Sequence, residues 1–219
     1  MHSERRTFLR NSLLATCAAA IGMPASAEAP QSVLAKSDLV GRMKWLNPPA
    51  SWHRAGETIL VHTTGKTDFW REPPADFRDN GHFFHLAVNG DFAFQAQMVG
   101  QYTARYDQAG VLLRVDSENW VKCCTEFFDG VRHASMVFTR GFSDWSAIPD
   151  LSQSAPIWWR VVRKKNWVEA LCSADGKNFT SLRQGYFVAA ASTDAGIMCA
   201  APEGPGFDAT FANLKIELG

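Results

Sequence analysis

Apolar and polar residues alternate in short runs along most of the chain, and this period-two pattern is typical of β-strands. The runs with this pattern cover residues 57–64, 82–100, 109–130, 132–140, 157–176, 196–201 and 208–218. Turn signals separate them about every 8–12 residues, at Asn89-Gly90, Asp129-Gly130, Asp175-Gly176 and Pro205-Gly206. No long segment keeps a helical period. The pattern predicts an all-β fold, a two-sheet antiparallel β-sandwich of the jelly-roll type.

Two hairpins are predicted within this pattern. The Asn89-Gly90 dipeptide favours a tight turn that pairs the two strands of residues 82–100. Residues 109–130 form the second hairpin, with residues 117–119 as its connection. In that register one face is almost wholly apolar and is expected to face the core, with Val111, Leu113, Val115, Val121, Cys123, Thr125 and Phe127.

The opposite face of this second hairpin is polar, and it sets Arg114 directly across from Lys122. Like charges directly opposite each other in a cross-strand pair destabilise the sheet, by roughly several tenths of a kcal/mol. Asp116 and Glu126 are internal groups that would compensate, and a bound polar ligand is an external one. Trp120 on the same face offers a ring for stacking. The competing interpretation is an ordinary solvated face, which antiparallel sheets often keep.

The N-terminus predicts export. Residues 5–10 read RRTFLR, a modest apolar stretch follows, and Ala25-Ser26-Ala27 is a small-x-small cleavage pattern. The motif resembles a twin-arginine signal. We expect a signal peptide over residues 1–27, a leader or short helix over 28–43, and a sandwich domain over 44–219. The expected location is periplasmic or secreted.

Composition excludes several classes of protein. The chain has 219 residues, 15 Phe, 8 Trp and no formal net charge, so it can build one sizeable core and has no basic surface for nucleic acid. No apolar run reaches the about 18 residues of a membrane span. The four cysteines after the signal could form disulfides or stay buried thiols, and their spacing does not indicate zinc. His82 and His85 are poor joint ligands on a strand. No cofactor or metal is assigned, and a structural calcium stays open.

Eight motifs carry a family resemblance: TDFWRE, DNGHFF, YDQAGVLLRVDSENWVK, TEFFDG, FSDWSAIP, WWRVVRK, SADGKNF and AAPEGPGFDATFANLKIE. In this order they resemble the DUF1349 family, also called regulation-of-enolase-1-like proteins, over Leu46 to Leu218. The resemblance implies a concanavalin A-like lectin/glucanase sandwich with a concave sheet face. Motif residues expected to line that face are Trp70, His82, Gln108, Arg114, Trp120, Lys122, Glu126, Asp144, Trp145 and Arg160.

These residues support three hypotheses of function. The first is non-catalytic binding of a saccharide or similar polar ligand, because tryptophan stacks on sugar C–H faces and polar side chains bind hydroxyls. The alternative is a glycoside hydrolase or polysaccharide lyase with Glu126 in the site, although no paired acidic motif is present on its strand. The third is a protein-interaction or regulatory domain, which the family's name implies. An exported protein would not meet a cytoplasmic enolase.

Overall fold

The structure is a computed structural model that describes residues 36–149 and 156–219. The predicted signal peptide lies outside the described residues, as does the first half of the predicted leader. The leader's remaining part contains helix α1 (Lys36–Arg42), whose Leu39 and Val40 side chains are buried in the core. Within the described ranges, no helix has the length and apolar composition that a membrane-spanning helix requires.

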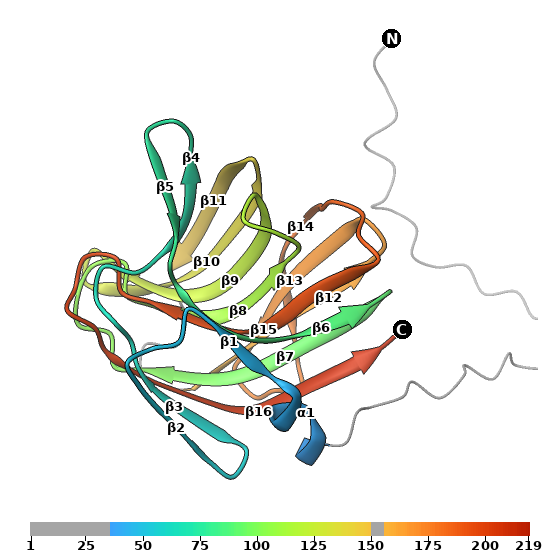
Figure 1. Cartoon of the computed structure of the whole chain (residues 1–219), viewed down its shortest axis with the longest axis horizontal. Coiled ribbons are helices and arrows are strands. Elements are labelled where there is room, and N and C mark those ends of the chain that lie inside the picture. Colours follow the sequence, from blue (N-terminus) through green and yellow to red (C-terminus); the bar gives the residue numbers. More distant parts are fainter. Residues whose placement is uncertain (1–35, 150–155) are drawn as a thin grey trace, which may run out of the picture. The chain divides into compact units, whose positions relative to one another are not determined.

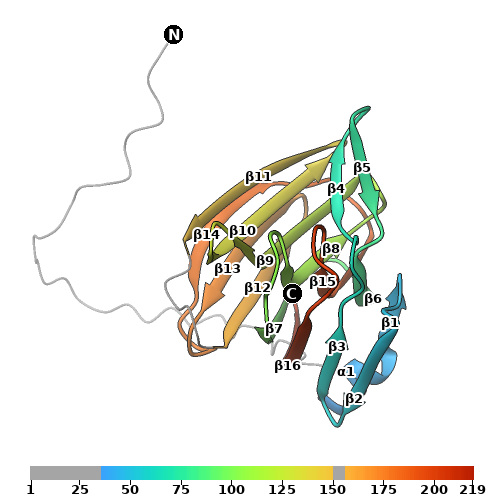
Figure 2. The same cartoon turned by 90° about the vertical axis from the view of Figure 1, so that its left-hand side faces the viewer.

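Two seven-stranded sheets pack face to face, which confirms the predicted β-sandwich (Figures 1 and 2). The first, which we call the site sheet, has the order β1 (Lys44–Leu46), β6 (His82–Asn89), β15 (Ser192–Ala200), β8 (Gln108–Arg114), β9 (Asn119–Phe128), β10 (Val131–Arg140) and β11 (Phe142–Pro149). The second, the back sheet, has the order β14 (Thr180–Tyr186), β13 (Trp167–Ser173), β12 (Ile157–Lys164), β7 (Phe92–Gly100), β16 (Asp208–Leu218), β3 (Thr58–His62) and β2 (Ser51–Ala55). Neighbouring strands run antiparallel.

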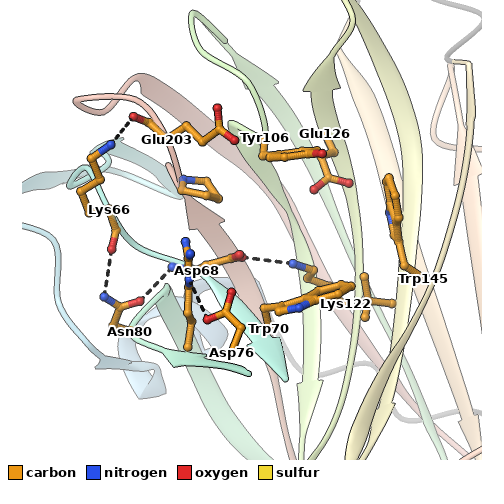
Figure 3. A pocket seen from close by; sticks show the side chains of 13 residues that line it. Lys66, Asp68, Trp70, Asp76, Asn80, Tyr106, Lys122, Glu126, Trp145 and Glu203 are labelled. Carbon is orange, nitrogen blue, oxygen red and sulfur yellow. Dashed lines mark hydrogen bonds and ion pairs between the residues drawn. The ribbon is translucent and has the colours of Figure 1, made fainter. Parts of the chain in front are cut away.

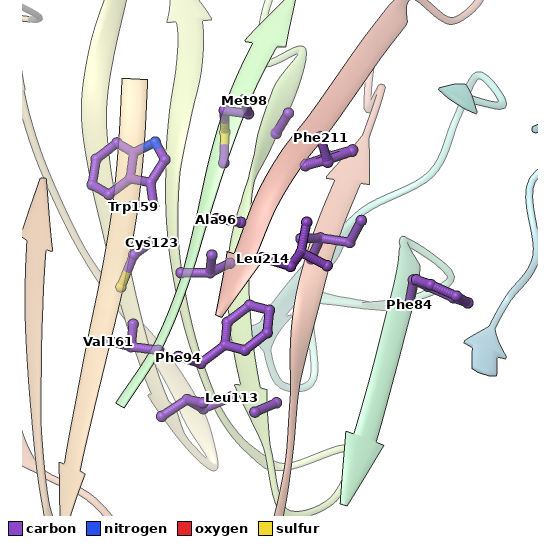
Figure 4. Packing of buried hydrophobic residues seen from close by; sticks show 14 of the residues in the cluster. Phe84, Phe94, Ala96, Met98, Leu113, Cys123, Trp159, Val161, Phe211 and Leu214 are labelled. Atoms are coloured by element: carbon purple, nitrogen blue, oxygen red, sulfur yellow. The ribbon is translucent and has the colours of Figure 1, made fainter. Parts of the chain in front are cut away.

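The main hydrophobic core lies between the two sheets and takes one face of each (Figure 4). Phe94 and Trp159 come from the back sheet, and Leu113 and Cys123 come from the site sheet. Because successive strand residues point to opposite faces, Cys124 does not join this core. It packs in a smaller cluster on the outer face of the site sheet, and both thiols are free.

The prediction of a hairpin at Asn89-Gly90 is wrong. The two strands exist, but β6 belongs to the site sheet and β7 to the back sheet, so the turn carries the chain from one sheet to the other. Gly90 does adopt the positive φ that the dipeptide favours, at 72°. The turn residues determine only the local backbone conformation and not which strands pair. Each strand instead pairs with partners distant in sequence, β6 with β15 and β7 with β12 and β16.

The predicted register of the β8–β9 hairpin is wrong by two residues. Arg114 lies across from Trp120, and Lys122 lies across from Leu112. The connection has four residues, 115–118, because the Asp116 carboxylate accepts hydrogen bonds from the backbone N–H groups of Glu118 and Asn119, each at 2.8 Å. A slip of two residues keeps every side chain on its predicted face. The predicted core face is confirmed for its apolar members except Phe127, which is half-buried outside the core cluster, whereas the like-charge pair does not exist.

A separate hairpin stands on the outer face of the site sheet and was not predicted from the pattern. It consists of β4 (Phe69–Glu72) and β5 (Asp76–Asp79) and stands beside the curved strands β9–β11 in Figure 1. Phe69 anchors it in the outer cluster, where it is fully buried against Trp120 and Val137, among others. The hairpin therefore turns an open sheet face into a partly covered one.

Candidate functional site

A pocket of about 740 Å³ lies between the β4–β5 hairpin and the outer face of the site sheet (Figure 3). Its floor comes from β9 and β10, and one wall comes from the hairpin. The other walls come from β11 and from four connections: β3–β4, β5–β6, β7–β8 and β15–β16. The residues that line it are Lys66, Asp68, Trp70, Asp76, Arg78, Asn80, Tyr106, Lys122, Glu126, Val137, Trp145, Pro202 and Glu203.

Lys122 is the buried cation of the pocket floor, with only 1% of its surface exposed. Its Nζ donates hydrogen bonds to Gln108 Oε1 at 2.7 Å and to the Phe69 carbonyl at 2.9 Å, and it lies 3.3 Å from Asp68 Oδ1. Burial lowers the pKa of Lys122, but the negative charges of Asp68 and Glu126 outweigh it and leave the pKa above its ordinary value. The side chain therefore stays an ammonium ion.

Glu126 is the second buried charge of the floor, and one of its oxygens is unsatisfied. Burial raises the pKa of this carboxyl group above its ordinary value, against the opposing effects of the Lys122 ammonium and a hydrogen bond from Ser135. Oε2 is shielded from solvent and has no hydrogen-bond partner among the described residues. A buried polar atom without a partner costs free energy, so Oε2 is suited to hydrogen-bond a ligand group that enters the pocket.

Three aromatic side chains form the pocket walls. Trp70 comes from the hairpin, Tyr106 from the loop before β8, and Trp145 from β11. Figure 3 shows the Trp70 ring next to Lys122 and the Trp145 ring beyond it, on the β11 side of the pocket. Trp145 is 42% exposed, and its Nε1 donates a hydrogen bond to Ser135 Oγ at 2.9 Å. Rings held by such contacts present flat apolar surfaces to a ligand at little entropic cost.

Four of the ten predicted site residues line this pocket: Trp70, Lys122, Glu126 and Trp145. Gln108 lies directly behind them and binds both Lys122 and Asp68. Trp120 is on the same sheet face but only 1% exposed, because the hairpin root covers it. Its ring therefore has no surface on which a ligand could stack.

The remaining four predicted residues lie away from the pocket in structural contacts. His82 is held by the Asn47 carbonyl and the Thr64 N–H, at 2.7 and 2.9 Å, and burial lowers its pKa. Arg114 pairs with Asp79 at 2.8 Å.

Asp144 and Arg160 are separated from the pocket by strand geometry. Asp144 points away from its neighbour Trp145 and pairs with Arg183 of the back sheet at 2.7 Å. Arg160 is on the back sheet itself and pairs with Glu217. It therefore does not line the concave face on which the family resemblance placed it.

Asp68 and Tyr106 are pocket residues that the sequence analysis did not single out. Asp68 stands in the TDFWRE motif directly before the hairpin, and Tyr106 stands at the start of YDQAG. The only available signal was their place in these motifs, since no periodic pattern covers either residue. Within the described ranges, no group of three or more His, Cys, Asp or Glu side chains is arranged to hold a metal ion.

The raised pKa of Glu126 predicts a pH-dependent difference between the wild type and Glu126→Gln. The unfolded state loses this proton near the ordinary value of 4.5, before the folded state does. Wild-type stability relative to the variant should therefore decrease as pH rises from about 4.5 through the folded-state pKa. Urea unfolding of both proteins from pH 4 to 7 measures this. Asp79, whose pKa burial also raises, is present in both and cancels. A constant difference would mean that Glu126 titrates at its ordinary pKa.

A family model described as "Protein of unknown function (DUF1349)" matches residues 45–218. The chain belongs to the DUF1349 family. A relative in this family is "Regulation of enolase protein 1" of Saccharomyces cerevisiae, which is 34% identical over 185 residues that cover 84% of this chain and 93% of the relative. A crystal structure of a functionally unknown S. cerevisiae protein superposes with a TM-score of 0.80 at 32% identity, over 83% of this chain and 98% of that one.

More distant solved structures share the fold of this DUF1349 protein. A GH43 protein, BlXynB of Bacillus licheniformis, matches 81% of this chain with a TM-score of 0.64 and 17% identity. The match covers 37% of that longer protein. Carbohydrate binding module CBM66 of Bacillus subtilis matches 79% of this chain and 94% of its own, with a TM-score of 0.51 and 11% identity. The sandwich is therefore a fold that glycoside hydrolase and carbohydrate-binding proteins also use.

Proposed function

We propose that this protein binds a saccharide in the pocket between the β4–β5 hairpin and β9, without catalysis. The observation that carries the proposal is the combination of two wall indoles, Trp70 and Trp145, with a floor that holds Lys122 and the unsatisfied Glu126 Oε2. A sugar ring has apolar C–H faces that pack on aromatic rings and hydroxyl groups that both donate and accept hydrogen bonds. A pocket of about 740 Å³ is also within the usual size range of small-molecule sites. The names of the GH43 and CBM66 neighbours support this choice of ligand class.

Trp145 is the more accessible of the two indoles, and its removal tests the proposal. Trp145→Ala should weaken binding of any recognised glycan by about tenfold or more, because a stacking wall is lost. An array of neutral and acidic glycans, followed by isothermal titration calorimetry, measures the effect. The matched control is Trp167→Ala on β13, where the ring is 55% exposed on the back sheet. Failure of the wild type to bind any glycan, or an equal loss in both variants, would contradict the proposal.

Hydrolysis or elimination is the second candidate function, favoured by one observation. Asp68 and Glu126 are two carboxyl groups in the same pocket, which is the minimum set for most glycosidases. Against this, Asp68 Oδ1 already accepts hydrogen bonds from the Phe69 N–H, Gln108 and Lys122. Release of reducing ends from a polysaccharide by the wild type, and its loss in Glu126→Gln, would replace the binding proposal with this one.

We also propose export through the twin-arginine pathway, which rests on the RRTFLR motif at residues 5–10 and the small-residue pattern after it. In an exported protein, a role in regulating cytoplasmic enolase, as the yeast relative's name describes, is disfavoured. Replacing both Arg5 and Arg6 with Lys should leave the precursor in the cytoplasm, because twin-arginine signals depend on the paired guanidinium groups. Cell fractionation with immunoblotting measures this. Unchanged delivery of the Arg5→Lys/Arg6→Lys protein to the periplasm would exclude this route.

A further inference from the structure

One end of the pocket is bordered by exposed side chains of loops that hydrogen bonds join to one another. Lys66 Nζ donates to the Glu203 carbonyl at 2.6 Å, and Asn80 Nδ2 donates to the Lys66 carbonyl at 3.1 Å. Asn80 Oδ1 accepts from the Asp68 N–H at 2.9 Å. Figure 3 shows Lys66, Asn80 and Glu203 grouped on the side of the pocket opposite Trp145. A ligand chain that enters past Trp145 therefore meets these loops at the opposite end.

The hairpin covers a second side because it is fixed to the sheet at two places, the edge strand β11 and the central strand β8. The Arg71 N–H binds Ser143 Oγ at 2.9 Å, and Arg71 Nε binds the Gly141 carbonyl at 2.8 Å, so β4 is tied to the start of β11. Asp79 on β5 is tied to Arg114 at the end of β8. Trp120, on the part of β9 beneath this bracing, is almost fully buried. A linear ligand cannot continue along β9 past the hairpin.

The remaining side, beyond Trp145, continues as a strip of aromatic rings. The Phe128 ring centroid lies 5.6 Å from that of Trp145 and 5.9 Å from that of Tyr106. His133 stacks on Phe128 at 3.6 Å. His133 is itself buried and supports the Phe128 ring from one side, so we call Tyr106, Phe128 and Trp145 the aromatic strip. Such a strip extends the surface on which a second and third sugar residue could pack.

The charges that line the pocket nearly balance. Three basic and four acidic side chains are present, and the most buried of the bases, Lys122, is neutralised by Asp68 and Glu126. A polyanionic chain would meet no excess of positive charge, so electrostatic complementarity favours a neutral ligand.

On the basis of the proposed function, we infer that the pocket takes the terminal residue of a neutral saccharide chain and that the aromatic strip binds the residues next to it. The joined loops at one end and the braced hairpin exclude the interior of a long chain. The terminal residue lies between the two indoles and reaches Glu126 Oε2. The protein then binds chain ends. The amount of protein that a polymer can bind is therefore proportional to its number of chain ends.

The experiment uses the purified mature protein and an array of linear neutral xylans, glucans, mannans, galactans, arabinans and fructans. Each glycan is present as oligomers of one to six residues, as the polymer, and with either terminal residue blocked by methylation. For a recognised glycan, affinity per chain should rise from one residue to about three and then stay constant. Blocking one end should reduce affinity about tenfold or more, and blocking the other should not. Cleaving the polymer should increase its capacity in proportion to the ends created.

A pair of variants tests the strip separately from the pocket. Phe128→Ala should weaken the trisaccharide about fivefold and leave the monosaccharide unchanged, whereas Trp145→Ala should weaken both. Trp167→Ala should change neither, and thermal melting confirms that each variant is folded. Polymer binding that follows the number of internal residues, or equal affinity for both blocked forms and the free glycan, would overturn the chain-end inference alone. Binding to an acidic glycan and to none of the neutral ones would overturn this inference alone, whereas absence of binding to both classes would overturn the proposed function with it.

Discussion

The Lys122→Met variant is expected to lose about 3–5 kcal/mol of unfolding free energy, because it removes one partner of a buried ion pair. Met has nearly the shape of Lys without the ammonium group, so packing changes little. Asp68 and Glu126 would then remain in the pocket floor without their cation, and Gln108 Oε1 would lose its donor. For a chain of this size the melting temperature should fall by roughly 6–20 °C. Urea unfolding at pH 7 and differential scanning calorimetry measure the loss.

Two further variants show whether the uncompensated carboxylates cause this effect. Lys177→Ala removes an exposed ammonium in the β13–β14 connection and should change stability by less than about 0.5 kcal/mol. Adding Glu126→Gln to Lys122→Met should restore part of the loss, since one buried negative charge disappears. If the double variant has a lower free energy of unfolding than Lys122→Met, the charge-based explanation is wrong.

Trp159→Ala should destabilise the fold by about 3–5 kcal/mol, the usual range for removing a buried aromatic side chain from a core. Trp159 is fully buried between the sheets. Its Nε1 donates a hydrogen bond to Thr125 Oγ1 at 3.3 Å, which joins β12 to β9 directly beneath the pocket floor. The variant should therefore lose both stability and glycan binding. Denaturant unfolding, with binding measured well below the melting temperature, separates the two losses.

The adjacent tryptophan supplies a matched control for this variant. Trp158 occupies the next position on β12, points out of the back sheet and lies over the Gly176 turn. Trp158→Ala removes the same atoms from a half-buried site and should cost about 1 kcal/mol without affecting binding. Equal destabilisation by both substitutions would contradict the placement of the core at Trp159.

Part of the site could be predicted because strand alternation is a local property. The faces of β9 follow from its own residues, so Lys122 and Glu126 were placed together on the outer face and Val121 and Cys123 in the core. Asp144 and Trp145 were both expected on the concave face from the family resemblance, but they are adjacent on β11 and therefore point to opposite sides. The cross-strand partner of Lys122 was mistaken because the register depends on how the Asp116 carboxylate shapes the connection.

The rest of the site depends on contacts between residues distant in the chain. Asp68 lies 54 residues before Lys122, and Arg71 lies 72 residues before Ser143. No periodic pattern in the sequence predicts such contacts. A long loop closes only where the packing of its ends offsets the entropy that closure costs. The need for a ligand was inferred from a like-charge pair that is absent. It rests instead on the unsatisfied oxygen of Glu126.

The sequence by itself determined the fold class and the two faces of the central strands, because a period of two specifies which side chains share a face. It also determined the family, through eight motifs between residues 67 and 217, and the family model over residues 45–218 confirms this. Only the tertiary structure decided which strands pair and that β6 and β7 lie in different sheets. It also decided that the β4–β5 hairpin covers Trp120 and brings Asp68 to Lys122. The position of this hairpin depends on the burial of Phe69 in a cluster that five other strands form. No local stretch of residues encodes such a cluster.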